Sequence, residues 1–425
     1  MSDAAFDQAR GYFVAGNAAL EAGRLREAEL QFMASLQALP GRPSTLVNLA
    51  ATRRRLGRPA EAIEPLHTAL AAQPGDPEAW HHLGAALVDL GRHTEALQAL
   101  DRAIAAGAAD AGVHYRRGLA LVALNRRPEA AQAWERALTR DDRFVPAWVD
   151  LGTLMRDIGQ HDRARQCLQR AVELGADDPV LRFQLSALQE GTREGLPPPE
   201  APPRAYVRQL FDDYAEGFDA HLVDALGYQT PQLLADGLAG VGVARFPAAL
   251  DLGCGTGLCA PPLSPWVGQL DGVDLSARMI ERARALGRYD HLEQADAVEY
   301  LQRTDRRYAL VVAADVFIYV GALESVFAGV MRVLEPGGVL CFSVEVAEAS
   351  PAGGQAACAT GYVLRPTLRY AHAESYLSAL AHTHGLQVCA TQRHALRQDH
   401  GAALDGLCVW MRRPALAKPT GSVEA

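Results

Sequence analysis

Small residues recur with a step of 34 along the first part of this 425-residue chain. Three columns carry the pattern: Gly16, Ala50, Gly84, Gly118 and Gly152; Ala28, Ala62, Ala96, Ala130 and Ala164; and Gly23, Gly57, Gly91, Asn125 and Gly159. Within one period, leucines and alanines fall at helical spacing on both sides of the third column. The pattern predicts five helical hairpins over about 9–178 that stack into a solenoid, because a single hairpin cannot bury its apolar face.

The hairpin pattern ends near residue 178, and 179–189 is expected to form a helix that covers the last apolar face of the stack. The segment 191–204 then carries five prolines, which cannot continue a helix or a sheet. We therefore expect a repeat domain over 1–190, a proline-rich spacer over 191–204 and a second domain over 205–425.

Short apolar runs alternate with helical stretches in the second half of the chain. The runs are 248–253, 270–275, 291–296, 308–317 and 337–346. This alternation predicts a doubly wound α/β domain with a mostly parallel sheet over 246–425, whose ligand site lies beyond the carboxyl ends of the strands. Ahead of it, 205–245 places Phe211, Tyr214, Phe218 and Leu222 at helical spacing, so this segment could fold over a ligand or simply pack on the sheet.

Composition narrows the classes of function. The chain has 41 Lys and Arg against 50 Asp and Glu, a formal net charge of −9, which disfavours binding to nucleic acid. No stretch is typical of a secretory signal or of a membrane-spanning helix. Seven cysteines without a CxxC pair fit reduced thiols better than disulfides or a zinc site. We expect a cytoplasmic protein without a bound metal.

A glycine-rich loop, DLGCGTG at 251–257, follows the first apolar run. Such a loop lets the backbone approach a ligand, but alone it fits a dinucleotide, a mononucleotide or no ligand. Asp274 ends the second run, where a carboxylate can accept both ribose hydroxyls, and Asp296 ends the third, placed to accept from an adenine amino group. Because Asp251 would repel a pyrophosphate, the pattern favours S-adenosylmethionine over NAD. These acids could instead be helix or loop caps.

Both halves resemble known families. The 34-residue units resemble the tetratricopeptide repeat (TPR), whose pattern stands here at Trp80, Leu83, Gly84, Gly91, Glu95, Ala96 and Ala103. The runs LDLGCGTG, GVDLSARMIERAR, QADA, VVAADVFIYV and LEPGGVLCFSVE resemble the successive motifs of class I S-adenosylmethionine-dependent methyltransferases, which have a Rossmann-like fold. The whole chain is similar to bacterial methyltransferases fused to such repeats.

The TPR resemblance implies that a protein or peptide binds in a concave groove of the repeats. Candidate contacts there are His81, His82, Tyr115, Arg116 and Arg156.

The methyltransferase resemblance implies roles for individual residues. The amino-acid part of the cofactor would be held by Asp251, Gly253, Cys254, Gly255 and Gly257, the ribose by Asp274, and the adenine by Leu275, Met279, Asp296 and Ala297, with Asp315 and Tyr214 near the transferred methyl group. Methyl transfer from a sulfonium is an in-line displacement, so positioning and desolvation supply much of the acceleration and a dedicated base is not always required. Polar catalytic candidates are Asp315, Tyr319, Tyr370 and His372.

The residues after the fourth apolar run narrow the acceptor. The chain has AADVF there, without an NPPY-like, DPPY-like or PCQ-type run, which disfavours methylation of adenine or cytosine in nucleic acid. Small molecules, carrier-bound acids and proteins stay open. Two hypotheses result: an active methyltransferase whose repeats recruit a protein partner or a carrier-bound substrate, and a non-catalytic S-adenosylmethionine-binding scaffold.

Overall fold

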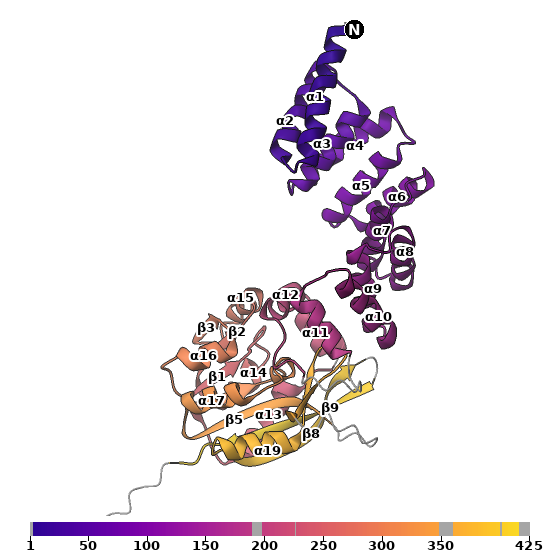
Figure 1. The fold of residues 1–425 in the computed structure, drawn as a ribbon. Helices are drawn as coiled ribbons and strands as arrows, with labels where there is room; N and C mark the ends of the chain where they lie inside the picture. Colours follow the sequence, from indigo (N-terminus) through magenta and orange to yellow (C-terminus); the bar gives the residue numbers. More distant parts are fainter. Residues whose placement is uncertain (1–2, 189–197, 226, 348–359, 400–401, 416–425) are drawn as a thin grey trace, which may run out of the picture. The chain divides into compact units, whose positions relative to one another are not determined.

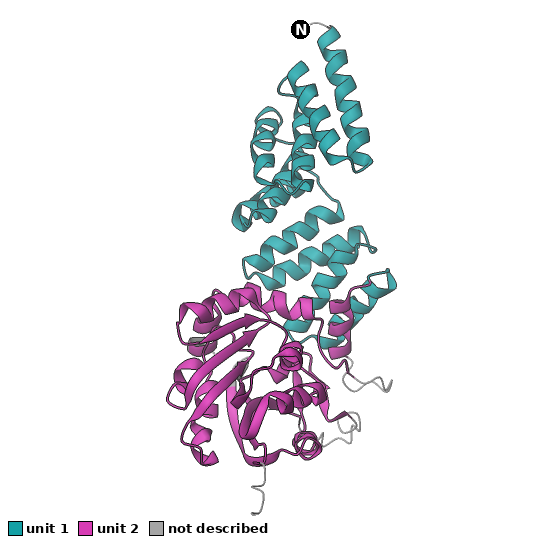
Figure 2. Cartoon of the chain, turned by 90° about the vertical axis from the view of Figure 1, so that its left-hand side faces the viewer, with its two compact units in different colours: residues 1–176 teal, residues 177–425 magenta. Residues whose placement is uncertain are grey.

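The computed structural model describes residues 3–188, 198–225, 227–347, 360–399 and 402–415 (Figure 1). Their contacts divide the chain into two compact units, 1–176 and 177–425 (Figure 2). This division lies ahead of the boundary expected at 190. Within the described residues, no helix has the length and apolar character that crossing a membrane requires.

In residues 3–176, the described part of the first unit, every regular element is a helix. The helices are α1 (Asp3–Glu21), α2 (Leu25–Ala38), α3 (Pro43–Arg55), α4 (Ala60–Ala72), α5 (Pro77–Asp89), α6 (His93–Ala105), α7 (Ala111–Ala123), α8 (Arg127–Arg140), α9 (Val145–Asp157) and α10 (His161–Glu173). Each odd-numbered helix packs against the even-numbered helix that follows it, and each pair packs against the next pair. The prediction of five stacked helical hairpins is confirmed.

The repeated columns have separate physical roles. The column that begins at Gly23 lies in the turn between the two helices of each hairpin. It needs a left-handed backbone, with φ of +73° at Gly23 and +57° at Asn125, which glycine and asparagine tolerate best. The column that begins at Gly16 and includes Gly118 lies where the two helices of a hairpin cross. A Cβ atom added to Gly118 would lie 2.2 Å from Nε1 of Trp134, so only a residue without a side chain fits there.

A nine-stranded sheet forms the centre of the second unit. Its strands are β1 (Phe246–Leu252), β2 (Val267–Asp274), β3 (His291–Gln294), β4 (Tyr308–Ala313), β5 (Leu334–Val346), β6 (Tyr362–Leu364), β7 (Tyr370–His372), β8 (Gln387–Asp399) and β9 (Ala402–Arg412). Strands β3, β2, β1, β4 and β5 are parallel in this order, and β9 adds to β5 and β8 to β9 in antiparallel pairing. The doubly wound, mostly parallel sheet is confirmed.

Helices and helical turns surround this sheet. They are α11 (Pro179–Ala187), α12 (Arg204–Tyr214), the π-helical turn η1 (Ala220–Ala225), α13 (Thr230–Gly237), the short 3₁₀ helix η2 (Leu238–Val241), α14 (Ala260–Leu263), α15 (Ala277–Ala285), α16 (Ala297–Arg303), the 3₁₀ helix η3 (Phe317–Tyr319), α17 (Glu324–Val333) and α19 (Glu374–Thr383).

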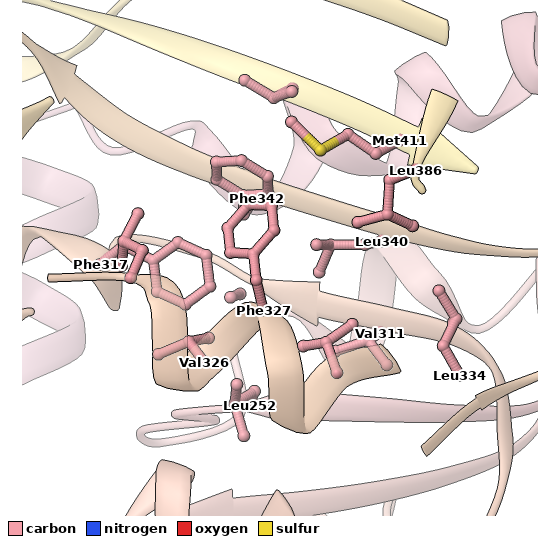
Figure 3. Packing of buried hydrophobic residues seen from close by; sticks show 14 of the residues in the cluster. Leu252, Val311, Phe317, Val326, Phe327, Leu334, Leu340, Phe342, Leu386 and Met411 are labelled. Atoms are coloured by element: carbon pink, nitrogen blue, oxygen red, sulfur yellow. The ribbon is translucent and has the colours of Figure 1, made fainter. Parts of the chain in front are cut away.

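Both faces of the sheet are buried, because alternate residues of one strand enter different cores. On β5, Leu340 and Phe342 pack with Phe327 of α17 in one cluster (Figure 3), whereas Val339 and Cys341 pack in the other with residues of α13 and α14. Central strands buried on both sides are what a parallel sheet requires. The loops at the carboxyl ends of β1, β2 and β4 are thereby held on a rigid base.

Helix α11 belongs to the second unit. From the sequence it was expected to be the last helix of the repeats. Its Phe183 packs in one cluster with Tyr362, Leu368 and Tyr370, and the ring centroids of Phe183 and Tyr370 are 6.3 Å apart. The helix expected from residue 179 onward is present as α11, and its Phe183 packs within the second unit.

Only the end of the expected spacer lies within the described residues, since 189–197 are outside them. That end is fastened to the second unit by its carbonyl groups. The Tyr370 hydroxyl donates to the Pro199 carbonyl at 2.7 Å, and the backbone N–H groups of Gly321 and Ala322 donate to the Glu200 carbonyl at 2.8 and 3.0 Å. Proline lacks a backbone donor but keeps its carbonyl acceptor, so a proline-rich segment can still be held in this way.

Candidate functional site

A cavity of about 870 Å³ lies at the carboxyl ends of β1, β2 and β4. Its walls come from the loops that follow these strands and β3, and from residues 200–222 ahead of the sheet. Strand β1 stands between β2 and β4, so the strand order reverses beside it. In open α/β sheets this is where ligands bind, and it is where the sequence predicts a site.

The glycine-rich loop lines the cavity with backbone. Gly253 and Gly255 have φ of +72° and +54°, a conformation that suits glycine. A Cβ atom on Gly253 would lie 2.5 Å from Cγ2 of Val316, so the loop could not take this course with a side chain there. Cys254 also lines the cavity, but Gly257 does not. A Cβ atom on Gly257 would lie 2.7 Å from Cδ1 of Leu286, which indicates a packing role.

Asp274 reaches the cavity wall from the end of β2 and is fixed by the backbone around it. Its Oδ2 accepts from the N–H of Gly255 at 2.9 Å, and its Oδ1 accepts from the N–H of Ser276 at 2.8 Å. Burial raises the pKa of this carboxyl group, and the two backbone hydrogen bonds act against that rise. Each oxygen keeps a second lone pair, so the carboxylate can still accept from two hydroxyl groups.

Asp251 does not line the cavity, contrary to the sequence expectation. It still belongs to β1 and pairs in register with Gly272 and Val312, so its side chain is fully buried within the sheet layer. Oδ2 accepts from the Tyr289 hydroxyl at 2.7 Å, and the Cys259 thiol is a second hydrogen-bonding neighbour of this carboxyl group. Burial raises the pKa of the Asp251 carboxyl group to about 7, against the hydrogen bond from Tyr289.

The residues expected at an adenine base divide in the same way. Leu275, Asp296 and Ala297 line the cavity, whereas Met279, in the first turn of α15, is completely buried and does not. Asp296 is also the N-cap of α16: one oxygen accepts from the Glu299 N–H at 3.1 Å, and the other lies 3.4 Å from Nε of Arg204. Asp296 therefore caps α16 and also lines the cavity.

Of the four catalytic candidates, Asp315 and Tyr319 line the cavity. Asp315 has φ of +55°, which is unfavourable for a residue with a side chain and is often found at functional sites. Ser343 holds it there, because its Oγ accepts from the Asp315 N–H at 2.7 Å and donates to Oδ1 at 2.5 Å. The carboxylate thus has a fixed direction at the carboxyl end of β4.

Tyr370 and His372 do not line the cavity and are completely buried. Both belong to β7, which pairs with β5 and β6, so their side chains enter the core. Nε2 of His372 lies 3.0 Å from the carbonyl oxygens of Val320 and Gly321, which only accept, so this nitrogen carries the proton. Burial lowers the pKa of His372 to about 4, which keeps the ring neutral and structural.

An aromatic wall closes the cavity on the side of residues 204–222, which we call the cap segment. Phe211, Tyr214 and Phe218 of this segment line the cavity together with Tyr319 of η3. The ring centroids of Phe211 and Tyr319 are 5.2 Å apart and those of Tyr214 and Phe218 are also 5.2 Å apart, both nearly perpendicular. Leu222, the fourth residue of the helical spacing found in the sequence, also lines the cavity. The cavity lining favours the interpretation in which this segment folds over a ligand.

Polar contacts fasten the cap segment to the loops beneath it. The Ser276 hydroxyl donates to Asp212 and the Thr256 hydroxyl donates to Asp219, each at 2.5 Å. Arg204 forms ion pairs with both Asp296 and Glu299. The cap segment is therefore bonded to the same loops that carry Asp274, Gly255 and Asp296.

Several residues that line the cavity were not predicted from the sequence. Glu200, Ala201, Pro202 and Arg204 line the cavity although their segment was interpreted as a spacer. Thr256, within the glycine-rich loop, and Arg369 line it although neither was proposed as a site residue. The acidic residues of the cap segment were one available signal for contact with the loops. Asp219 accepts from the hydroxyl of Thr256, and Asp212 accepts from the hydroxyl of Ser276. In the part of the chain that the structure describes, no group of His, Cys, Asp and Glu is arranged to hold a metal ion.

Comparison with known proteins identifies both units. Residues 249–338 match the family model of a methyltransferase domain, and residues 53–119 and 115–179 match models of the tetratricopeptide repeat. The chain therefore carries tetratricopeptide repeats and a methyltransferase domain.

Two curated relatives are methyltransferases. The malonyl-[acyl-carrier protein] O-methyltransferase of Enterobacter lignolyticus (strain SCF1) is 32% identical over 107 residues, which is 25% of this chain and 42% of that protein. Methyltransferase-like protein 27 of Homo sapiens is 31% identical over 151 residues, or 33% of this chain and 59% of that protein. The chain thus spans about half the length of these relatives.

Two solved structures resemble part of the chain. The MamA protein is 26% identical, with a TM-score of 0.35, over 40% of this chain and 92% of that one. A thermophilic TPR protein of Thermus thermophilus is 26% identical, with a TM-score of 0.37, over 42% of this chain and 98% of that one.

Proposed function

We propose that the methyltransferase domain binds S-adenosylmethionine in the cavity beside β1 and transfers its methyl group, and that the repeats bind a protein or peptide that brings the substrate. The observation that carries the cofactor proposal is the Asp274 carboxylate, oriented by the N–H groups of Gly255 and Ser276 at the wall of a cavity. A carboxylate in this place, after the second strand, suits the two hydroxyls of a ribose.

The other cavity residues fit the same molecule. Gly253 and Gly255 leave the backbone open to the amino-acid part, while Asp296 and Ala297 stand where an adenine edge would lie. The faces of Phe211, Tyr214, Phe218 and Tyr319 can attract a sulfonium through cation–π interaction. Asp251 would not contact the ligand directly, because it is fully buried beneath the loop.

S-adenosylmethionine, when bound, would supply an electrophilic methyl group. The chain's own contribution is then orientation and exclusion of water, which supply much of the acceleration of such a displacement. Asp315, fixed by Ser343, is the group we propose to orient an acceptor or to take its proton, with Tyr319 as the alternative. His372 has no such role, because it lies in the core.

Small molecules, carrier-bound acids and proteins are the acceptor classes that we propose. One relative is named for O-methylation of a malonyl group on an acyl-carrier protein, which keeps carrier-bound acids among them. We propose the cytoplasm as the location and consider nucleic acid an unfavourable acceptor, given the net charge of −9.

Calorimetric titration with S-adenosylmethionine tests the cofactor proposal. We expect binding to the full chain, and at least about tenfold weaker binding for Asp274→Ala, because its two hydroxyl acceptors are lost. Asp236→Ala, on the exposed side of α13, is the matched control and should bind like the unchanged chain. Unchanged affinity of Asp274→Ala, with its fold verified by circular dichroism, would overturn the assignment.

A radioactive methyl-transfer assay separates an enzyme from a scaffold. The repeats are used to capture partners, and each captured fraction is incubated with the full chain and tritiated S-adenosylmethionine. Incorporation of label supports the enzyme. Cofactor binding without labelling of any captured fraction would support the alternative, a non-catalytic scaffold that binds S-adenosylmethionine.

A further inference from the structure

Residues 199–204 connect the end of the proline-rich spacer to the first residue of α12, and we call them the strap. Glu200, Ala201, Pro202 and Arg204 of the strap line the cavity. Pro202 is buried, although the chain around it has no regular secondary structure. The strap is therefore part of the cavity wall and differs from a loose connection between domains.

The first end of the strap is held by Tyr370 and by the loop that follows β4. The Tyr370 hydroxyl donates to the Pro199 carbonyl at 2.7 Å. The N–H groups of Gly321 and Ala322 donate to the Glu200 carbonyl at 2.8 and 3.0 Å. Three donors thus fix two successive carbonyl groups of the strap.

The second end of the strap is held at the start of α16. Nε of Arg204 lies 3.4 Å from Oδ2 of Asp296, and the same guanidinium group forms an ion pair with Glu299. Helix α16 follows β3, whereas Gly321 and Ala322 follow β4, and β2 and β1 lie between β3 and β4 in the sheet. The strap therefore runs across the cavity from the loop after β4 to the loop after β3.

The Tyr370 ring gives the first end a fixed anchor. The ring is completely buried, and its centroid lies 6.3 Å from that of Phe183 and 5.9 Å from that of Tyr362. A Cβ atom added to Gly321 would lie 2.6 Å from Cε1 of Tyr370, so the loop after β4 passes directly against this ring. The Tyr370 hydroxyl therefore has one position from which to hold the strap.

From these contacts we infer that the strap closes the cavity over a bound ligand, and that Tyr370 is the positioning residue that keeps it closed. The inference rests on the proposed binding of S-adenosylmethionine, because Arg204 pairs with Asp296, which is proposed to face the adenine. Tyr370 does not line the cavity and acts through the Pro199 carbonyl. The sequence pointed to this tyrosine as a catalytic candidate, and the structure assigns it this other role.

The composition of the strap suits a segment that opens and closes as one unit. Three of its six residues are proline, whose fixed φ keeps the chain stiff and lowers the entropy lost on closing. Glu200, Ala201 and Arg204 are exposed, so water competes for the bonds at both ends. A stiff segment held by a few such bonds can open at small cost, which exchange of a ligand requires.

Hydrogen exchange of single amides in the full chain tests whether Tyr370 holds the strap. Tyr370→Phe removes only the hydroxyl and keeps the ring, so the Pro199 carbonyl loses its donor. We expect the amide protons of Gly321 and Ala322 to exchange about tenfold faster or more, because the Glu200 carbonyl that accepts from them belongs to the released strap.

Leu323 supplies an internal control. Its N–H donates to the Tyr376 hydroxyl at 2.8 Å, outside the strap, and should exchange at an unchanged rate in Tyr370→Phe. Tyr376→Phe is the matched variant, since it removes a hydroxyl from another tyrosine that packs on the same cluster. It should speed exchange at Leu323 and leave Gly321 and Ala322 protected.

Stopped-flow displacement of S-adenosylmethionine tests closure over the ligand. We expect dissociation to be about tenfold faster from Tyr370→Phe and unchanged from Tyr376→Phe, because only the first variant releases the strap. The melting temperature of Tyr370→Phe should change little, since the ring and its packing stay in place.

The contrary results separate the steps of the inference. Unchanged exchange at Gly321 and Ala322 in Tyr370→Phe would overturn the role of Tyr370. Faster exchange at Leu323 as well, together with a lower melting temperature, would show that Tyr370 only stabilises the fold. Faster exchange with an unchanged dissociation rate would overturn closure over the ligand. If the unchanged chain binds no S-adenosylmethionine, the proposed cofactor is contradicted, and amide exchange still decides whether Tyr370 holds the strap.

Discussion

Asp251 is a carboxyl group that the fold keeps away from water and from the cavity. Tyr289, Asp274 and the thiol of Cys259 surround it, and burial raises its pKa to about 7. Below that pH the folded chain retains a proton that the unfolded chain has already lost at the ordinary acidic pKa. The free energy of unfolding therefore falls as pH rises from about 4 to about 7, since the folded state binds more protons in that window.

Asp251→Asn should remove this pH dependence. The amide keeps an oxygen that can accept from the Tyr289 hydroxyl, and it carries no charge to desolvate. We expect the variant to gain at least about 1 kcal/mol relative to the unchanged chain between about pH 5 and about pH 8. Urea unfolding of both proteins across this range measures the difference. If the free energy of unfolding changed with pH in the same way for both proteins, Asp251 would be ionised in the folded chain throughout this range.

At the scale of residues, the sequence predicted the cavity-lining positions that follow a strand end, whereas two of its candidates, Tyr370 and His372, lie in the core. Gly253, Gly255 and Asp274 stand directly at the carboxyl ends of β1 and β2, and strand alternation alone locates them. Tyr370 and His372 lie in a three-residue strand that closes a short hairpin, and no local pattern shows that this hairpin turns them into the core.

The cap segment lines the cavity on the side ahead of the sheet. Its aromatic side chains form one wall, and its acids hold the hydroxyls of Thr256 and Ser276. Helix α12 has no buried residue, so few apolar contacts hold it in place. Polar bonds to the loops therefore carry much of the attachment.

Asp219→Ala should loosen the cap segment without unfolding the domain. The variant loses the hydrogen bond from Thr256, and we expect S-adenosylmethionine to dissociate about tenfold faster, with little change in melting temperature. Stopped-flow displacement measures the dissociation rate. Asp236→Ala again serves as the control. An unchanged rate would mean that the Asp219 bond does not hold the segment over the ligand.

At the scale of elements, periodicity predicted which faces are buried but not what buries them. Helix α11 shows this limit: its Leu181 and Phe183 are buried as the apolar spacing requires, yet Phe183 packs on Tyr370 of the second unit. Long-range packing of this kind leaves no mark in a helix of nine residues. Strands β1, β2, β4 and β5 were predictable because burial on both faces gives them continuous apolar runs.

The whole molecule has separate cores in its two units, so damage to one should leave the other intact. Gly118→Ala places a Cβ atom against the Trp134 ring, and overpacking of this kind costs about 1 to 3 kcal/mol. We expect the unfolding transition of the repeats to move to lower temperature in differential scanning calorimetry, while S-adenosylmethionine affinity stays unchanged.

Gly11→Ala is the matched control for this prediction. Gly11 lies in helix α1 with no atom within 4 Å of an added Cβ, so the change should stabilise the repeats by about 0.5 to 1 kcal/mol. A common shift of both transitions in Gly118→Ala would show instead that the two units unfold together.

The 34-residue period has a consequence for how such a chain can change in length. Each hairpin packs mainly on the hairpins directly before and after it, and every column keeps the same phase. Insertion or deletion of one whole period leaves each surviving helix with an equivalent neighbour. A single inserted residue would rotate every later side chain of its helix by about 100° and misalign the columns. Evolution or design can therefore lengthen the repeat unit in whole repeats while the methyltransferase domain stays as it is.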